Sequence, residues 1–141
     1  MNEQGMPTSN VMKDEFNWEV PVESVPLPSK GIIYSPDSLL YNTETLQIKA
    51  MTAKEEDILT SQAYIKEGVM IEKLISSCLI DKSINVNDLI AGDRNALMVS
   101  IRITGYGSDY NVSHTCTSCD HVNKITANLS ELKIKRFRIN V

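Results

Sequence analysis

One segment, DRNALMVSIRITGYG at residues 93–107, is apolar on nearly every side of the helix that it predicts. A helix of this kind is stable in water only when most of its surface is covered by other protein. We therefore expect the chain to fold around this helix, or to present part of it to a partner protein. Asp93 is expected to cap the helix start, and Gly105 and Gly107 are expected to end the helix.

Two further helices are expected before this one. Thr52 and Glu55 have the spacing of a capping box, which predicts a helix from about residue 52 to residue 65. The acidic start of this helix, EED, is expected to face solvent. The segment VMIEKLISSCLI at residues 69–80 places its apolar residues on one stripe, as in a second helix. Cys78 lies on that stripe and is expected to be a small core residue.

Strand-forming residues flank the helical region on both sides. GIIY at residues 31–34 and ETLQIKAMT at residues 44–52 predict a two-stranded ribbon. DYNVSHTC at residues 109–116 and HVNKITANL at residues 121–129 predict two strands joined by a cysteine turn. The predicted fold class is therefore α+β, with three helices in the middle of the chain, an N-terminal β-ribbon and a C-terminal β-hairpin that bears a CxxC knuckle.

The domain boundary is expected near residue 24. Residues 1–24 are polar and acidic without a sustained period, which favours a flexible N-terminal arm. Residues 25–141 are predicted to form a single α+β domain, with a zinc-knuckle-like hairpin at residues 109–128. A chain of 141 residues is long enough for one core of this kind.

Four residues are candidate contacts for a partner protein. Phe16 and Trp18 lie in the expected arm, and aromatic side chains are favoured anchors at interfaces. The alternative is that this short segment folds back as a strand on its own domain. Arg94 and Arg102 lie in the apolar helix, where each is equally suited to an ion pair across an interface and to a role within the domain.

The cysteine turn has the residue types of a metal site. Cys116 and Cys119 have the spacing at which two thiolates bind one ion, and His121 and His114 are near enough to supply further ligands. A structural Zn²⁺ is one interpretation, with remaining ligands from this chain or from a partner. Two reduced thiols in a metal-free turn are the other. Redox catalysis is disfavoured, because strand-like segments rather than a helix N-terminus flank the cysteines. No other catalytic constellation stands out, so we expect a protein that is not an enzyme.

Composition excludes several classes of protein. The net charge of −4 argues against recruitment of nucleic acid or of an anionic membrane by bulk electrostatics. No apolar run approaches the roughly 18 residues of a membrane span, and no signal peptide is expected. The end of the chain is locally basic, so a zinc-ribbon-like nucleic-acid-binding module is retained as an alternative. Its phosphate-binding residues are then Lys133, Lys135, Arg136 and Arg138.

The order of the motifs resembles a known protein family. LPSKGIIY, IKAMTAKEEDIL, MIEKLISSCL, LIAGDRNALMVSIRITGYGSDY, CTSC and NLSEL follow one another between about residues 25 and 135. In this order they resemble the baseplate hub assembly proteins of T-even-like contractile-tailed bacteriophages. The most specific matches are Leu89, Gly92, Asp93, Arg94, Arg102, Gly105, Tyr106, Gly107 and Tyr110.

The resemblance implies a late viral protein that acts in tail assembly without catalysing a reaction. Such a protein is either a structural part of the virion baseplate or a chaperone-like factor that assists the assembly of the hub. The expected partners are other phage tail and baseplate proteins, with self-association as a further option, and no membrane. The expected location is the host cytoplasm during assembly, and the baseplate of the virion tail if the protein is retained.

Overall fold

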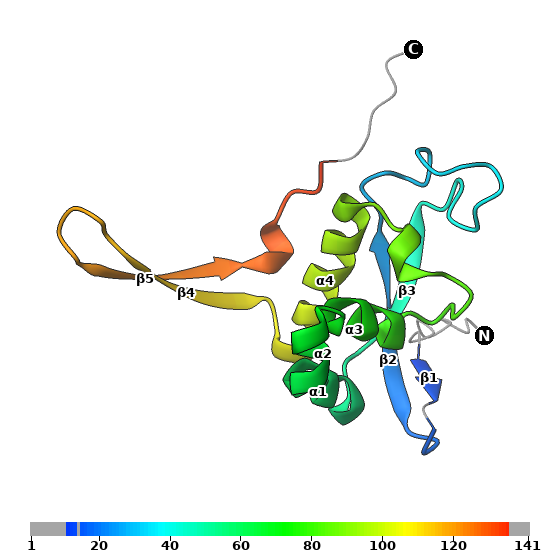
Figure 1. Cartoon of the computed structure of the whole chain (residues 1–141), viewed down its shortest axis with the longest axis horizontal. Coiled ribbons are helices and arrows are strands. Elements are labelled where there is room, and N and C mark those ends of the chain that lie inside the picture. Colours follow the sequence, from blue (N-terminus) through cyan, green and yellow to red (C-terminus); the bar gives the residue numbers. More distant parts are fainter. Residues whose placement is uncertain (1–10, 14, 136–141) are drawn as a thin grey trace, which may run out of the picture.

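The structure, a computed structural model, describes residues 11–13 and 15–135. In this part of the chain, a three-stranded sheet is followed by helices and then by a separate two-stranded hairpin (Figure 1). The elements are β1 (Val11–Lys13), β2 (Glu19–Pro26), β3 (Thr45–Lys49), α1 (Ala53–Thr60), α2 (Gln62–Glu67), α3 (Met70–Cys78), the 3₁₀ turn η1 (Val86–Asp88), α4 (Ala91–Tyr106), β4 (Asp109–Thr115), β5 (Val122–Asn128) and the 3₁₀ turn η2 (Leu129–Glu131). The predicted α+β class is confirmed.

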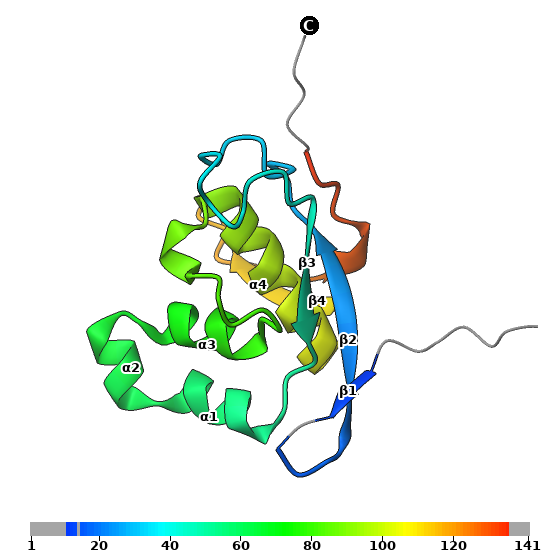
Figure 2. The ribbon, with the colours of Figure 1, turned by 90° about the vertical axis from the view of Figure 1, so that its right-hand side faces the viewer.

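The first sheet is antiparallel, and β2 is its middle strand. β3 buries Leu46 and Ile48 and leaves the Gln47 side chain between them exposed, as expected for a strand with one face on the core. Helices α1, α2 and α3 gather on one side of the sheet, and α4 packs against α3, β2 and β3 (Figure 2). The core fills the space between these elements. Its largest fully buried apolar residues are Val25, Leu27, Leu40, Ile48, Ile75, Cys78, Leu79, Leu97 and Ile101.

Cys78 is fully buried in this core, as predicted, and burial raises the pKa of its thiol to about 11. The thiol therefore stays protonated at neutral pH and behaves as a small apolar group. Helix α4 is covered mainly on one face, where Leu97 and Ile101 are buried, while Met98 and Val99 are only half-buried. The prediction that α4 is covered on most sides is thus fulfilled only in part within this chain.

The expected boundary between arm and domain, at residue 24, is wrong for residues 19–24. These residues belong to β2, where Val22 to Pro26 pair with β3 and Val20 is buried. The partner of β3 was expected to be the segment at residues 31–34, which forms turns instead. Gly31 adopts a left-handed φ of +72°, which interrupts a strand, and its carbonyl accepts a 3.0 Å hydrogen bond from the Asn42 amide. Residues 1–10 of the expected arm lie outside the described residues.

The first predicted helix is divided into two. Ser61 has an extended backbone, so it ends α1 and also caps α2, with its hydroxyl accepting from the Tyr64 amide at 3.5 Å. The capping box at Thr52 and Glu55 is confirmed. Helix α4 begins at Ala91, two residues before its predicted cap, and continues through Gly105 to Tyr106. The described residues therefore contain four α-helices rather than three.

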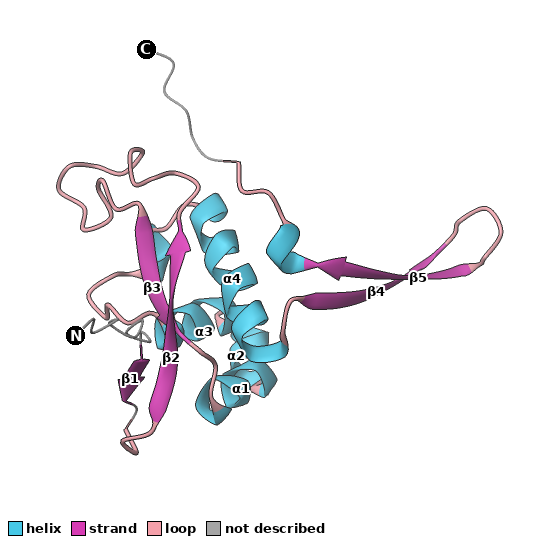
Figure 3. Cartoon of the chain, turned by 180° about the vertical axis from the view of Figure 1, so that it is seen from behind, coloured by secondary structure: helices cyan, strands magenta, loops and turns pink. Residues whose placement is uncertain are grey.

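The hairpin of β4 and β5 extends away from the rest of the molecule (Figures 1 and 3). It occupies the predicted residues 109–128, and β4 is exposed along its whole length. Within the described residues, no helix is both long and apolar enough to cross a membrane.

Candidate docking groove and cysteine turn

The cysteine turn lies at the tip of the hairpin. The Cys116 amide donates to the carbonyl of His121 at 2.8 Å, and the Asp120 amide donates to the carbonyl of Cys116 at 2.9 Å. Asp120 takes a left-handed φ of +58°, which turns the chain back toward β5 directly after Cys119. Both cysteines are free thiols at the far end of the projecting strands.

The backbone of the turn favours ionisation of one thiol. The amides of Ser118 and Cys119 lower the pKa of Cys116 by hydrogen bonding to its sulfur, and the Cys119 side chain contributes to the same shift. Amide donors to sulfur are the arrangement that metal-binding cysteine turns use to stabilise thiolate. The same contacts place the two sulfurs next to each other, as the CxxC spacing predicts.

The structure does not bring the predicted histidines into this arrangement. Among residues 11–13 and 15–135, no three side chains of His, Cys, Asp or Glu gather as a metal site. His114 pairs with Asn123 within the hairpin, and His121 lies at the end of the turn. The described geometry therefore provides two of the four predicted ligands together, Cys116 and Cys119.

Arg102 connects the last helix to the hairpin. Its guanidinium lies 4.9 Å from the ring centre of Tyr106 and 5.6 Å from that of Tyr110, and it donates to the carbonyl of Gly107 at 3.2 Å. Tyr106 ends α4 and Tyr110 is in β4, so these contacts join the two elements. Arg102, predicted as a partner contact, has this role within the chain.

Arg94 lies near the start of α4. It donates through Nη2 to the carbonyl of Val86 at 3.3 Å, while its Nε is buried and has no hydrogen-bond partner among the described residues. Its contact thus holds the η1 turn against α4. The carbonyl of Val86 is the only acceptor that the described residues give to Arg94.

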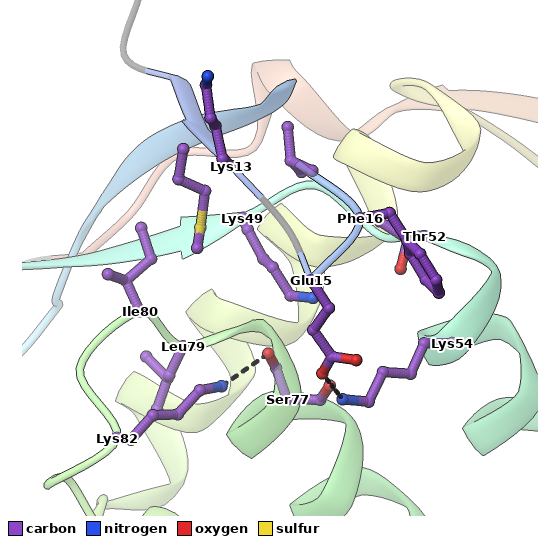
Figure 4. Close-up of a pocket in the computed structure, with 12 residues that line it drawn as sticks. Lys13, Glu15, Phe16, Lys49, Thr52, Lys54, Ser77, Leu79, Ile80 and Lys82 are labelled. Carbon is purple, nitrogen blue, oxygen red and sulfur yellow. Dashed lines mark hydrogen bonds and ion pairs between the residues drawn. The ribbon is translucent and has the colours of Figure 1, made fainter. Parts of the chain in front are cut away.

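A groove opens between β1, the end of β3, the start of α1 and the end of α3 (Figure 4). Its volume is about 240 Å³. Apolar side chains form much of its lining, among them Met12, Phe16, Val20, Leu79 and Ile80. Four lysines from four different segments also line it: Lys13, Lys49, Lys54 and Lys82.

The lysines give the groove a positive character. Lys49 forms a 2.7 Å ion pair with Glu55, and Lys54 lies 3.1 Å from the exposed carboxylate of Glu15. Lys82 donates to the carbonyls of residues 76 and 77 at the end of α3, at 2.8 and 2.9 Å. Burial lowers the pKa of Lys82, and the neighbouring charges of Lys49 and Lys54 lower it further. The Glu55 carboxylate acts in the opposite direction on the pKa of Lys82, so Lys82 lies among charges of both signs.

Glu55 lies beneath this groove and is fully buried, although its helix start was expected to face solvent. Burial by itself raises the pKa of Glu55, but the bonds from Lys49, Ser77 and Thr52 outweigh burial and lower the pKa to about 2. Its carboxylate accepts from the Ser77 hydroxyl at 2.6 Å and from the Thr52 amide at 2.9 Å. Glu55 therefore ties β3, α1 and α3 together where they border the groove.

Phe16 lines the groove, and Trp18 lies beside it. The two side chains are 77% and 74% exposed, respectively, which is high for large aromatic rings. Both line a second hollow of about 560 Å³ with Pro21, Met51 and other residues. The two predicted aromatic anchors thus border a continuous region that contains both hollows.

A buried polar cluster joins two segments that are far apart in the sequence, LPSKGIIY and the start of α4. Asp93 is fully buried and accepts from the Ser29 amide at 3.1 Å, from the Ser29 hydroxyl at 2.6 Å and from the Tyr34 hydroxyl at 2.5 Å. Burial and the Asp93 carboxylate raise the pKa of Tyr34 to about 12, so its hydroxyl remains a donor. The expected capping role of Asp93 is wrong, because Ile90 is the N-cap of α4. The cluster joins the LPSKGIIY segment to α4.

Comparison with known families decides the class of this protein. Residues 27–141 match the model of a family described as T4 bacteriophage base plate protein. The chain belongs to this family. It is therefore a bacteriophage baseplate protein, and the predicted resemblance is confirmed at this level. Neither the curated proteins nor the solved structures contain a match to the chain.

The matched segment of this baseplate protein includes all residues of the Asp93 cluster and the whole hairpin. Phe16 and Trp18 precede it, so the aromatic side of the groove lies outside the matched residues. The family associates the chain with the virion tail and with other baseplate proteins as partners. It does not favour the nucleic-acid alternative. Of the basic residues on which that alternative depends, Lys133 and Lys135 are exposed, while Arg136 and Arg138 lie outside the described residues.

Proposed function

We propose that this baseplate protein is a non-enzymatic part of the baseplate hub, or a factor in hub assembly, and that it acts by docking onto neighbouring proteins. Membership of the baseplate family supports the baseplate as the place where the chain acts. The lysine-lined groove carries the docking proposal, because apolar side chains and excess positive charge meet there in a chain whose net charge is −4.

The chemistry of the groove defines the segment that it accepts. An apolar side chain of the partner displaces water from the surface formed by Val20, Leu79 and Ile80. Acidic residues beside it meet Lys13 and Lys82, which lie on the rim, and increase both the association rate and the selectivity for that partner. The occupant is thus an acidic segment of another baseplate protein that carries at least one large apolar residue.

The proposed role of the chain in the baseplate hub is tested in infected cells. The chain is tagged at its C-terminus, and tail assembly intermediates and finished virions are purified and analysed by mass spectrometry. A hub component is expected in both fractions, whereas an assembly factor is expected only in the intermediates. Absence of the chain from both fractions contradicts the proposal.

A further inference from the structure

The hairpin tip presents half of a tetrahedral thiolate site. Cys116 and Cys119 are free thiols in a tight turn, which is closed by hydrogen bonds from the Cys116 amide to the His121 carbonyl and from the Asp120 amide to the Cys116 carbonyl. Zn²⁺ in structural sites is held by four ligands in a closed tetrahedral arrangement. Two ligands are therefore missing from the tip of a single chain.

The rest of the chain does not supply the missing ligands. In the described part of the chain, no third Cys, His, Asp or Glu joins the two thiols. Figures 1 and 3 show the reason, since the hairpin carries the turn away from the sheet and the helices. The remaining cysteine, Cys78, is buried in the core and is not available to bind metal.

The face of the hairpin that bears Cys116 is suited to pack against its own copy. Because side chains alternate along a strand, Tyr110, Val112 and His114 share a face with Cys116, and Ile125 lies opposite Val112. The exposed fractions of Tyr110, Val112 and Ile125 are 45%, 39% and 56%. The other face is mainly polar, with Thr126 donating to Asn111 at 2.8 Å.

A two-stranded hairpin with an uncovered apolar face is only marginally stable in water. Packing of two such faces about a twofold axis covers the same patch on both copies, and residues near the axis meet their own equivalents. The cysteine turn lies at one end of this face, so a twofold axis that runs along the strands covers both faces and places the two CxxC turns side by side.

We propose that Cys116 and Cys119 from two copies of the chain bind one structural Zn²⁺ through four thiolates. The ion joins two hairpins at their tips and makes a dimer of this baseplate protein. This site is independent of the groove, and binding at one does not require the other. Zn²⁺ has no redox activity here, so the role of the ion is to hold the two chains together.

The test measures metal content and mass on the same sample. The full chain is purified in a phosphine reductant with chelator, transferred to chelator-free buffer and titrated with Zn²⁺. We expect binding to saturate near one Zn²⁺ for every two chains, the mass by light scattering to double, and added chelator to reverse both changes. The phosphine excludes a dimer linked by a disulfide.

Variants at the hairpin tip distinguish this site, shared by two chains, from other modes of metal binding. Cys116→Ser and Cys119→Ser are each expected to abolish metal-induced dimerisation, while Ser118→Ala and His121→Ala are expected to retain it. Circular dichroism verifies that each variant is folded, which we expect because the tip makes no core contact. Binding of one Zn²⁺ per monomer overturns the proposal, whether or not it is lost in His114→Ala or His121→Ala, as does the absence of Zn²⁺ binding by the folded wild-type chain.

Discussion

The hydroxyl of Ser29 donates a 2.6 Å hydrogen bond to the buried carboxylate of Asp93, which lies 64 positions further along the chain. With the Tyr34 hydroxyl, this bond fixes the long turn region after β2 onto the first turn of α4. A buried carboxylate is tolerated only when its oxygens are satisfied in this way. The cluster is thus a structural joint of the domain, distinct from the groove and from the hairpin tip.

Replacement of Asp93 tests this joint. Asp93→Ala leaves the Ser29 and Tyr34 donors buried without an acceptor, so we expect the free energy of unfolding to fall by about 3 kcal/mol or more. Urea denaturation followed by circular dichroism measures the change. Asp88→Asn is the matched control, because Asp88 is exposed, and it is expected to change stability by less than about 0.5 kcal/mol. A similar loss in both variants contradicts the assigned role.

The Glu55 carboxylate predicts a specific response to acid. Its pKa falls from an ordinary value of 4.5 to about 2 in the folded state, so its stabilising contribution is complete above about pH 4.5 and is lost as the pH falls toward 2. Glu55→Gln leaves Lys49 without its anion and is expected to cost about 3 to 5 kcal/mol at pH 7. The difference between wild type and variant is expected to shrink between pH 4.5 and pH 2. A difference that does not change across this range contradicts the account.

Two glycines are expected to respond in opposite directions to alanine. Gly31 has a left-handed φ of +72°, and a Cβ at this position lies 2.3 Å from the Thr43 nitrogen and 2.6 Å from the Leu40 oxygen. Gly31→Ala is therefore expected to destabilise the domain by more than about 1 kcal/mol. Gly92, inside α4, has open space around it, and Gly92→Ala is expected to stabilise by about 0.5 kcal/mol because alanine favours a helix. Thermal unfolding of the two variants side by side reveals the sign of each effect.

Arg102 is expected to control how firmly the hairpin is attached. Loss of its contacts with Tyr106 and Tyr110 in Arg102→Ala removes about 0.5 to 1 kcal/mol of cation–π stabilisation. Amide hydrogen exchange in β4 and β5 is then expected to accelerate about two- to fivefold, with little change in the core helices. If amide exchange accelerates equally in the hairpin and in the core helices, Arg102 does not control the attachment of the hairpin.

Periodic segments of the sequence predicted most of the helices and the hairpin, because each of these depends on local spacing. The pairing of β3 with β2 was missed, since it depends on the left-handed backbone at Gly31, which sends residues 31–34 into turns. The burial of Glu55 was also missed. An acidic residue in a first helical turn usually faces water, and its partners Lys49 and Ser77 are brought to it only by the tertiary fold.

The candidate sites differ in how far the sequence reveals them. The cysteine pair is visible because its spacing is local, whereas its incomplete ligand set follows from the projection of the hairpin. The groove was not visible, because its four lysines belong to four segments between residues 13 and 82. Phe16 and Trp18 were the one local signal near it.

The affinity of the chain for its baseplate partner, measured with the groove charges reversed, tests the docking role most directly. Partner proteins identified in the tail intermediates are expressed singly, and binding is measured by calorimetry with wild type, the double variant Lys13→Glu with Lys82→Glu, and the control Lys73→Glu. Lys73 is exposed and does not line the groove. We predict that the double variant weakens binding about tenfold or more while the control binds as wild type does. Unchanged binding by a folded double variant contradicts the role of the groove.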